Sequence, residues 1–388
     1  MKPDSWLERA AWVLLVLLVL SLPMEKGFQF PHLGTISRLL GQAAFVAGAA
    51  AVAARRRLRR PNAALPVAAL FIGWCGVTWL WSAARPATVT RFVTMAQLLG
   101  MLWLIWEMCR TARRQRRLIE AFVAGAAASS AWTIARFALN RQTNYRRYAT
   151  AGFDPNDLGM TLAIALTFAL HLTVARRGLA AWLARAAAAA LVTAILLTAS
   201  RAALVAALAN VAFVALTWRQ TTTGQKASSV AILLLLVAGA TRLAPPATRA
   251  RLATLPEEAT EGTMHDRTRI WKAGMHLFEK HPLLGVGLGA YPKAAYPELR
   301  IHYNAHNTFL SVLVEDGIVG FVLFGGLLAT LVWFAGLLGP SERALWFGVL
   351  AVWAVGVSTV AWEHRKPTWL IFALIATAAA RAFQPEEG

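Results

Sequence analysis

Long apolar blocks, each close to the length of a membrane-spanning helix, follow one another along most of the chain. Short polar connections separate them, and about twenty apolar residues are enough to cross the hydrocarbon of a bilayer as a helix. The pattern therefore predicts an all-α polytopic membrane protein with about twelve transmembrane helices, built as one integral membrane domain over residues 1–388. The predicted spans cover residues 10–22, 33–54, 63–82, 87–109, 118–140, 158–175, 179–199, 202–218, 228–244, 317–338, 344–362 and 367–381.

The composition agrees with a membrane protein. Apolar and aromatic residues make up 57% of the 388 residues, and charged residues make up 15%. Soluble proteins have about 45–50% and about 25% respectively, so a soluble globular enzyme is excluded. The first apolar run, 10–22, is expected to remain as a helix, because residues 23–25 offer no small-x-small cleavage site. Cys75 and Cys109 fall inside or at the end of predicted spans, which leaves no disulfide framework on the outer side.

The basic charge sets the predicted orientation. Lysine and arginine outnumber aspartate and glutamate by 39 to 19, which gives a net charge of +20. In a soluble protein this excess would suggest nucleic acid. Here the arginine clusters at 55–60 and 110–117 lie in short connections between apolar blocks, as cytoplasmic loops require, and no nucleic-acid partner is predicted. Residues 141–157 and 245–305 are then external, the second as a loop between predicted spans nine and ten.

The long external loop is predicted to be partly helical, because residues 266–282 have an apolar stripe at a period of 3.6 residues. The stripe consists of Ile270, Trp271, Gly274, Leu277 and Phe278. Arg267 lies at the centre of this stripe and Arg269 lies on the opposite face. An arginine on an apolar face needs a partner, so Arg267 is predicted to point inward at a substrate and Arg269 to be solvated.

A glycine alternation, Gly285-Val286-Gly287-Leu288-Gly289, follows the predicted helix. No strand precedes it, so a dinucleotide-binding turn of the Rossmann type is excluded. A tight turn packed on the membrane domain is the favoured interpretation, since glycine chiefly permits close backbone approach. Direct contact with a phosphate is the alternative.

Arginines are also frequent in the external segments and at the outer ends of spans, where the orientation rule does not require them. The set comprises Arg38, Arg91, Arg136, Arg146, Arg147, Arg201, Arg267 and Arg269. Those at span ends could snorkel to the interface. Taken together, the arginines could instead converge on a phosphate or pyrophosphate, whose oxygens suit the guanidinium fork. Arg136, Arg147, Arg201 and Arg267 are the predicted pyrophosphate-binding residues.

His306 lies where the long loop meets the next span, and its near-neutral pKa range suits a general base that takes a proton from a sugar hydroxyl. A hydrogen-bonded residue at a helix start is the alternative. His302 precedes it by four residues, but no third ligand and no Asp-x-Asp accompany the pair, so no metal site is predicted. Glu315 and Asp316 point apart on a helix, and a helix end or turn before Gly317 is the interpretation favoured for them.

Four segments, taken in order, resemble the O-antigen ligase and polymerase family of bacterial membrane glycosyltransferases. They are Gly152-Phe153-Asp154-Pro155-Asn156-Asp157-Leu158-Gly159, Thr198-Ala199-Ser200-Arg201, Arg267-x-x-Ile270-Trp271 through His281-Pro282-Leu283-Leu284-Gly285-Val286-Gly287, and Ala305-His306-Asn307-x-x-Leu310 with Glu315-x-Gly317-x-x-Gly320. The resemblance covers roughly residues 150–320, and the N-terminal spans contribute only topology.

The resemblance implies a GT-C-like, metal-independent glycosyltransferase without a cofactor in the inner membrane of a Gram-negative bacterium. Its partners would be a glycan on undecaprenyl pyrophosphate, an acceptor at the periplasmic face, and membrane lipids. By matching position, Arg201 and Arg267 would hold the pyrophosphate, His306 would activate the acceptor hydroxyl, and Asn307 would orient the site. Asn156, within the first matching segment, is a second predicted orienting residue.

The choice of lipid A-core as acceptor, and so of an O-antigen ligase in lipopolysaccharide assembly, is a separate step. It follows from the compact, helical external loop, because no large soluble domain accompanies it. An O-antigen polymerase and a protein O-oligosaccharyltransferase of the same family are alternatives. A lipid-linked glycan transporter is an alternative of a different class, for which inverted repeats would be expected.

Overall fold

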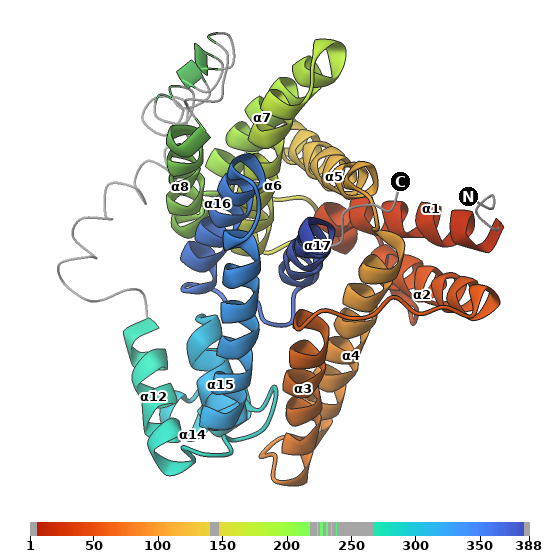
Figure 1. Cartoon of the computed structure of the whole chain (residues 1–388). Helices are drawn as coiled ribbons and strands as arrows, with labels where there is room; N and C mark the ends of the chain where they lie inside the picture. Colours follow the sequence, from red (N-terminus) through yellow and green to blue (C-terminus); the bar gives the residue numbers. More distant parts are fainter. Residues whose placement is uncertain are drawn as a thin grey trace. The chain divides into compact units, whose positions relative to one another are not determined.

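The computed structural model describes residues 6–139, 147–217 and 267–383, with a few helical positions between 223 and 238. Within these residues the chain is almost entirely helical, and its one sheet is a two-stranded antiparallel pair (Figure 1). The chain divides into two compact units, each described by itself. Unit 1 comprises Met1–Arg57, Met108–Leu255 and Leu338–Gly356, and unit 2 comprises Leu58–Glu107, Pro256–Leu337 and Val357–Gly388.

Unit 1 is built around a central buried helix, α6. Its elements are α1 (Trp6–Ser21), η1 (Leu22–Gly27), β1 (Gln29–Phe30), β2 (Gly34–Thr35), α2 (Ile36–Arg55), α5 (Ala112–Leu139), α6 (Pro155–Ala175), α7 (Gly178–Thr198), α8 (Arg201–Thr217) and α16 (Pro340–Val357). Helix α6 packs against α5, α7 and α8, and 15 of its 21 residues are buried. Phe168 meets Phe122 of α5 and Trp346 of α16 edge-on, an arrangement that aromatic pairs favour.

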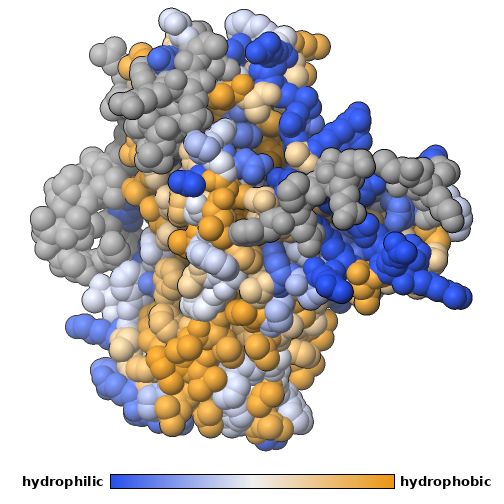
Figure 2. Space-filling view, viewed as in Figure 1, coloured by the Kyte–Doolittle hydropathy of each residue, from blue (hydrophilic) through white to orange (hydrophobic). Residues whose placement is uncertain are grey.

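Unit 2 is organised around the long helix α15. Its elements are α3 (Ala64–Val77), η2 (Thr78–Leu80), α4 (Arg85–Met108), α12 (Arg267–Lys280), α13 (Tyr291–Ala294), α14 (Tyr296–Leu299), α15 (Thr308–Gly336) and α17 (Lys366–Phe383). Helix α15 packs against α3, α12 and α17. Large apolar side chains such as Val322 and Trp333 remain exposed on α15, and Figure 2 shows mostly hydrophobic side chains over this part of the unit.

Seven helices among the described residues are long and apolar enough to cross a membrane. They are Trp6–Gly27, Ile36–Arg55, Arg85–Met108, Ala112–Leu139, Pro155–Ala175, Gly178–Thr198 and Thr308–Gly336. The protein is therefore an all-α, multi-pass membrane protein, as the sequence predicts. The count of twelve spans stays a prediction, and most of the predicted span 228–244 lies outside the described residues.

The helix predicted over 266–282 is confirmed as α12, Arg267–Lys280, and its external position stays a prediction. The next helix differs from its prediction, since α15 begins at Thr308 and not at Gly317. Asn307 caps it, because its side chain accepts hydrogen bonds from the amides of Phe309 and Leu310. A kink at Gly317, with φ 68° and ψ −172°, marks the position where the hydropathy pattern places the start of the span.

Candidate functional site

In unit 1, Arg147 joins two of the sequence segments that point to function. Its Nη2 donates to Oδ1 of Asn156 at 2.7 Å, and its Nε donates to the carbonyl of Thr198 at 3.0 Å. Tyr148 adds a backbone hydrogen bond to Leu197. The segment before α6 and the turn between α7 and α8 are thereby held together, which brings the predicted residues Arg147 and Asn156 into direct contact.

The turn that leads to Arg201 is closely packed. Ala199 ends α7 in the left-handed conformation, with φ 49°, and Arg201 is the first residue of α8. Gly159 of α6 lies against this turn, where a Cβ atom would be 2.6 Å from the Cβ of Ala203 and 3.2 Å from Oγ1 of Thr198. Arg201 is partly buried at this position. The glycine therefore allows α6 to approach the turn that carries Arg201.

Arg136 lies in the last turn of α5 and donates through Nη1 to the carbonyl of Ala149 at 2.8 Å. It thus supports the backbone two residues beyond Arg147. Asp154 caps α6 by accepting from the amides of Asn156 and Asp157, and Lys26 pairs with the carboxylate of Asp157 at 3.4 Å. Arg146, also part of the predicted basic set, lies outside the described residues.

In unit 2, α12 places its two arginines differently. Ile270 and Gly274 are buried, and Trp271, Leu277 and Phe278 are partly buried against the core of the unit. Gly274 leaves room for the buried Tyr291 hydroxyl, which donates to the carbonyl of Ile270. Arg267 is partly buried, whereas Arg269 is exposed. Arg269 is also structural, because its Nη2 donates to the carbonyl of Leu299 at 3.0 Å, which ties α12 to α14.

The glycine alternation forms a turn whose backbone donors are all used. Every amide from 285 to 291 donates a hydrogen bond to another protein atom. Glu315 is the main acceptor, since its carbonyl accepts from Gly287 and its carboxylate accepts from Gly289 at 2.7 Å and from Tyr291 at 3.2 Å. These contacts support the packed-turn interpretation of the glycines, because the amides that would bind a phosphate are already engaged.

The turn requires glycine at 285, where φ is 70° and a Cβ atom would lie 2.4 Å from the carbonyl oxygen of Glu315. We expect Gly285→Ala to lower the free energy of unfolding by about 1–3 kcal/mol through backbone strain. The change is measured as a lower melting temperature of the purified protein. Gly325→Ala is the matched control, because no heavy atom lies within 4 Å of its would-be Cβ. An equal melting temperature for Gly285→Ala and the control would contradict the packed turn.

His306 lies immediately before the cap of α15, in a left-handed backbone conformation with φ 49°. A non-glycine residue with such a φ is uncommon and is often found at functional positions. Its ring is partly exposed and tilts against Tyr303, with ring centroids 6.4 Å apart. Asn307 is engaged as the helix cap. His306 and Asn307 therefore lie at the capped start of α15, and His306 is the residue that precedes the cap.

His302, which precedes His306 by four residues, contacts other groups. Its ring stacks on Tyr296 with centroids 4.6 Å apart, and Nδ1 faces the carbonyl of Pro292 at 3.2 Å. Within the part of the chain that the structure describes, no three His, Cys, Asp or Glu side chains are grouped as metal ligands would be. Independence from metal stays a prediction.

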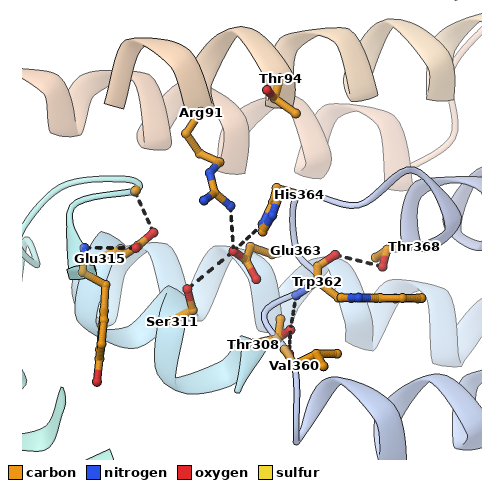
Figure 3. A network of polar contacts seen from close by, with 12 residues as sticks. Arg91, Thr94, Thr308, Ser311, Glu315, Val360, Trp362, Glu363, His364 and Thr368 are labelled. Carbon is orange, nitrogen blue, oxygen red and sulfur yellow. Dashed lines mark hydrogen bonds and ion pairs between the residues drawn. The ribbon is translucent and has the colours of Figure 1, made fainter. Parts of the chain in front are cut away.

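Unit 2 contains a polar network around Glu363 that the sequence did not predict (Figure 3). Glu363, between α16 and α17, is buried, and its Oε1 lies 2.9 Å from Nδ1 of His364, 3.5 Å from Oγ of Ser311 and 3.7 Å from Nη1 of Arg91. Thr308 accepts from the amide of Trp362 at 2.8 Å and donates to a backbone carbonyl of the same segment. The segment 360–364 is thereby fastened to the first two turns of α15.

The charges of this network follow from its burial and contacts. Burial alone would raise the pKa of Glu363, but the contacts with His364 and the charge of Arg91 lower it to about 2. Burial lowers the pKa of His364 to about 4, although Glu363 opposes this shift. Near neutral pH, Glu363 is ionised and His364 is neutral. Since a carboxylate only accepts, the proton of His364 lies on Nδ1 and leaves Nε2 as an acceptor.

Comparison with known proteins bears on both units. Residues 186–325 match the sequence profile described as O-antigen ligase. This stretch of the chain is similar to the O-antigen ligase family. It also resembles the exopolysaccharide production protein ExoQ of Rhizobium meliloti (strain 1021), at 31% identity over 81 residues. That match covers 18% of this chain and 19% of the relative, so the chain spans about a fifth of the length of ExoQ.

The matched segment contains four of the predicted site residues, Arg201, Arg267, His306 and Asn307. It also contains Glu315. Arg136, Arg147 and Asn156 precede it, and Arg91, Glu363 and His364 lie outside its two ends. Arg201 belongs to unit 1 and Arg267 to unit 2, so the convergence of these arginines on one pyrophosphate stays a prediction.

The sequence contains one signal for the polar network of Glu363. Thr308, Ser311 and Glu315 are spaced by three and four residues, which places them on one helical face. A polar stripe beside an apolar span requires polar partners. Glu363 and His364, directly after a predicted span, are the nearby candidates. Which of them meets which member of the stripe depends on tertiary structure.

Proposed function

We propose that the chain is an O-antigen ligase that transfers a polysaccharide from undecaprenyl pyrophosphate to lipid A-core. The reaction takes place at the periplasmic face of the inner membrane, on a GT-C-like membrane domain. The observation that carries this proposal is the match of residues 186–325 to the O-antigen ligase family, because it contains Arg201, Arg267 and His306. The left-handed backbone of His306 at the capped start of α15 supports a functional role for this residue.

The proposed reaction is a direct displacement. His306 removes the proton of the acceptor hydroxyl, and that oxygen forms a bond with the anomeric carbon on the face opposite the pyrophosphate. The bond between the anomeric carbon and the pyrophosphate oxygen breaks, and its electron pair leaves with the lipid pyrophosphate. The anomeric configuration is inverted. Arg201 and Arg267 stabilise the negative charge of the leaving group, with Arg147 and Arg136 supporting the segment in unit 1.

Transfer by purified protein in detergent tests the proposal. Radiolabelled glycan on its lipid carrier is supplied with lipid A-core, and the label should move to lipid A-core. The similarity to an exopolysaccharide production protein favours polymerisation of lipid-linked glycan as a second candidate function. Longer carrier-linked chains with no label on lipid A-core would support the polymerase. Label that stays on the unextended carrier would contradict both.

The transfer is also expected to proceed without a divalent metal, because arginines can supply the positive charge that a metal would give to a leaving pyrophosphate. Transfer in excess chelator should therefore stay near the untreated rate. Chelator saturated with magnesium beforehand controls for effects of the chelator on the detergent and lipid. A loss of activity that added magnesium or manganese restores would contradict metal independence.

A further inference from the structure

Arg91 has more hydrogen-bond donors than its ion pair with Glu363 uses. It lies on α4, less than two turns after the helix begins at Arg85, and its side chain is 23% exposed. Among the described residues it forms an ion pair with Glu363, with Nη1 3.7 Å from Oε1, and its charge also acts on the carboxylates of Glu315 and Asp316. This distance suits an ion pair but is longer than a hydrogen bond. A guanidinium group carries five N–H donors, so Arg91 retains donors for a further anion.

Glu363 has an acceptor atom without a hydrogen-bond donor. Its side chain is 3% exposed, and Oε1 faces His364, Ser311 and Arg91, while Oε2 is buried without a hydrogen-bond partner. A buried carboxylate oxygen without a donor is unfavourable and uncommon in a purely structural ion pair. Figure 3 shows Arg91 extending from α4 toward Glu363, with His364 on the neighbouring segment.

Hydrogen bonds anchor the segment that carries Glu363. Nε1 of Trp369 donates to the carbonyl of Glu363 at 2.7 Å, and Thr308 fastens the preceding residues to α15. The Arg91 side chain, in contrast, is partly exposed and meets Glu363 at ion-pair distance. Its guanidinium therefore has room to turn toward an added anion while the segment that carries Glu363 stays in place.

We propose that Arg91 is a further binding residue for the pyrophosphate of the donor, and that Glu363 acts as its internal counter-ion until that anion binds. This inference rests on the proposed function, which supplies an anionic donor. The fork of a guanidinium matches two phosphate oxygens, whereas its contact with Glu363 uses one nitrogen at ion-pair distance. The network that contains both residues also fastens the start of α15, two residues after His306.

The proposal has a distinctive consequence for the two members of the pair. Arg91→Ala removes a ligand and should weaken binding of inorganic pyrophosphate by about tenfold to a hundredfold, as expected for hydrogen bonds to a charged group. Glu363→Gln removes a competing negative charge while keeping the size of the side chain, and should strengthen pyrophosphate binding severalfold. A purely structural ion pair predicts instead that both substitutions weaken binding or leave it unchanged.

The experiment is isothermal titration of the purified full-length protein with inorganic pyrophosphate. Arg91→Lys, which keeps the charge but not the fork, should have intermediate affinity and serves if the alanine variant misfolds. Arg85→Ala is the matched control, since Arg85 is exposed on the same helix and donates to the carbonyl of Leu80; its affinity should equal that of the wild type. Wild-type affinity in folded Arg91→Ala, weaker binding in Glu363→Gln, or no binding by the wild type would each overturn the proposal.

Glycan transfer by the same wild-type preparation separates the two levels of inference. Transfer with pyrophosphate affinity that does not depend on Arg91 overturns the anion site and leaves the ligase proposal standing. Pyrophosphate affinity that depends on Arg91 and Glu363 in the predicted directions, without transfer to any acceptor, supports the anion site and contradicts the ligase.

Discussion

His306→Gln is expected to reduce turnover by about a hundredfold to ten-thousandfold, the usual contribution of a positioned general base. Glutamine keeps hydrogen-bonding atoms, but it does not take up a proton near neutral pH. Binding of the donor should be largely retained, because the proposed phosphate contacts belong to arginines and not to the histidine. The measurements are the turnover number for transfer and, separately, the affinity for carrier-linked glycan.

His302→Gln is the control for this result, since His302 is exposed and contacts Tyr296 and the carbonyl of Pro292. It should transfer glycan at close to the wild-type rate. Near-normal transfer by His306→Gln would leave His306 with the alternative role of a hydrogen-bonded residue at a helix start. Equal losses of turnover and donor affinity would place His306 among the binding residues and not at the acceptor.

Arg267→Ala should lower kcat/KM by about a hundredfold to a thousandfold, as expected when a charged donor to a developing anion is removed. Arg269→Ala should have a mild effect on transfer. The structure gives it a different consequence, because it removes the hydrogen bond from α12 to the carbonyl of Leu299, worth about 1 kcal/mol of stability. Melting temperature and transfer rate are measured on both variants. Arg267→Ala should lose mainly transfer rate, and Arg269→Ala should lose mainly melting temperature.

The two arginines lie two positions apart on one helix, and their variants are compared at matched expression and membrane insertion. Equal losses of transfer in both, at matched folding, would mean that the inward face of α12 is assigned wrongly. Arg201→Ala should resemble Arg267→Ala if both hold the same pyrophosphate. A mild effect for Arg201→Ala would restrict the proposed phosphate site to unit 2.

The sequence predicts well those features that depend on local pattern. Helix α12 and the difference in exposure between Arg267 and Arg269 follow from angles of 100° per residue, and they need no knowledge of distant residues. The apolar blocks indicate the seven long apolar helices among the described residues for the same reason, because a helix in lipid satisfies its own backbone. The packed glycine turn also follows from residue type, although its partner does not.

Features that depend on tertiary pairing are the ones that the sequence leaves open. Hydropathy places the start of the span at Gly317, since Thr308, Ser311, Glu315 and Asp316 count against an apolar helix. In the fold, Glu315 is satisfied by amides 26 and 24 residues away, and Thr308 by a segment 52 to 54 residues away. Long-range partners of this kind turn a polar stretch into the first turns of α15.

The same limit applies to the predicted site in unit 1. Arg147 and Asn156 are each recognisable from charge and motif, but their mutual hydrogen bond and the contact with Thr198 are properties of the folded chain. Glu363 and His364 belong to no motif and follow an apolar block, where charged residues usually mark the end of a span. The polar stripe on α15 requires partners, but the burial of Glu363 beside Arg91 is seen only in the folded chain.

The anchoring of residues 285–291 to α15 determines how this turn can move. Amides 286, 287, 289 and 291 donate to Val314 or Glu315, so they should be shielded from exchange with solvent as long as α15 keeps its first turns. A hinged lid would need its hydrogen bonds within itself and few to the helix that it packs on. If the donor is the proposed lipid-linked glycan, we expect its entry to be gated by other segments, because this turn moves together with α15.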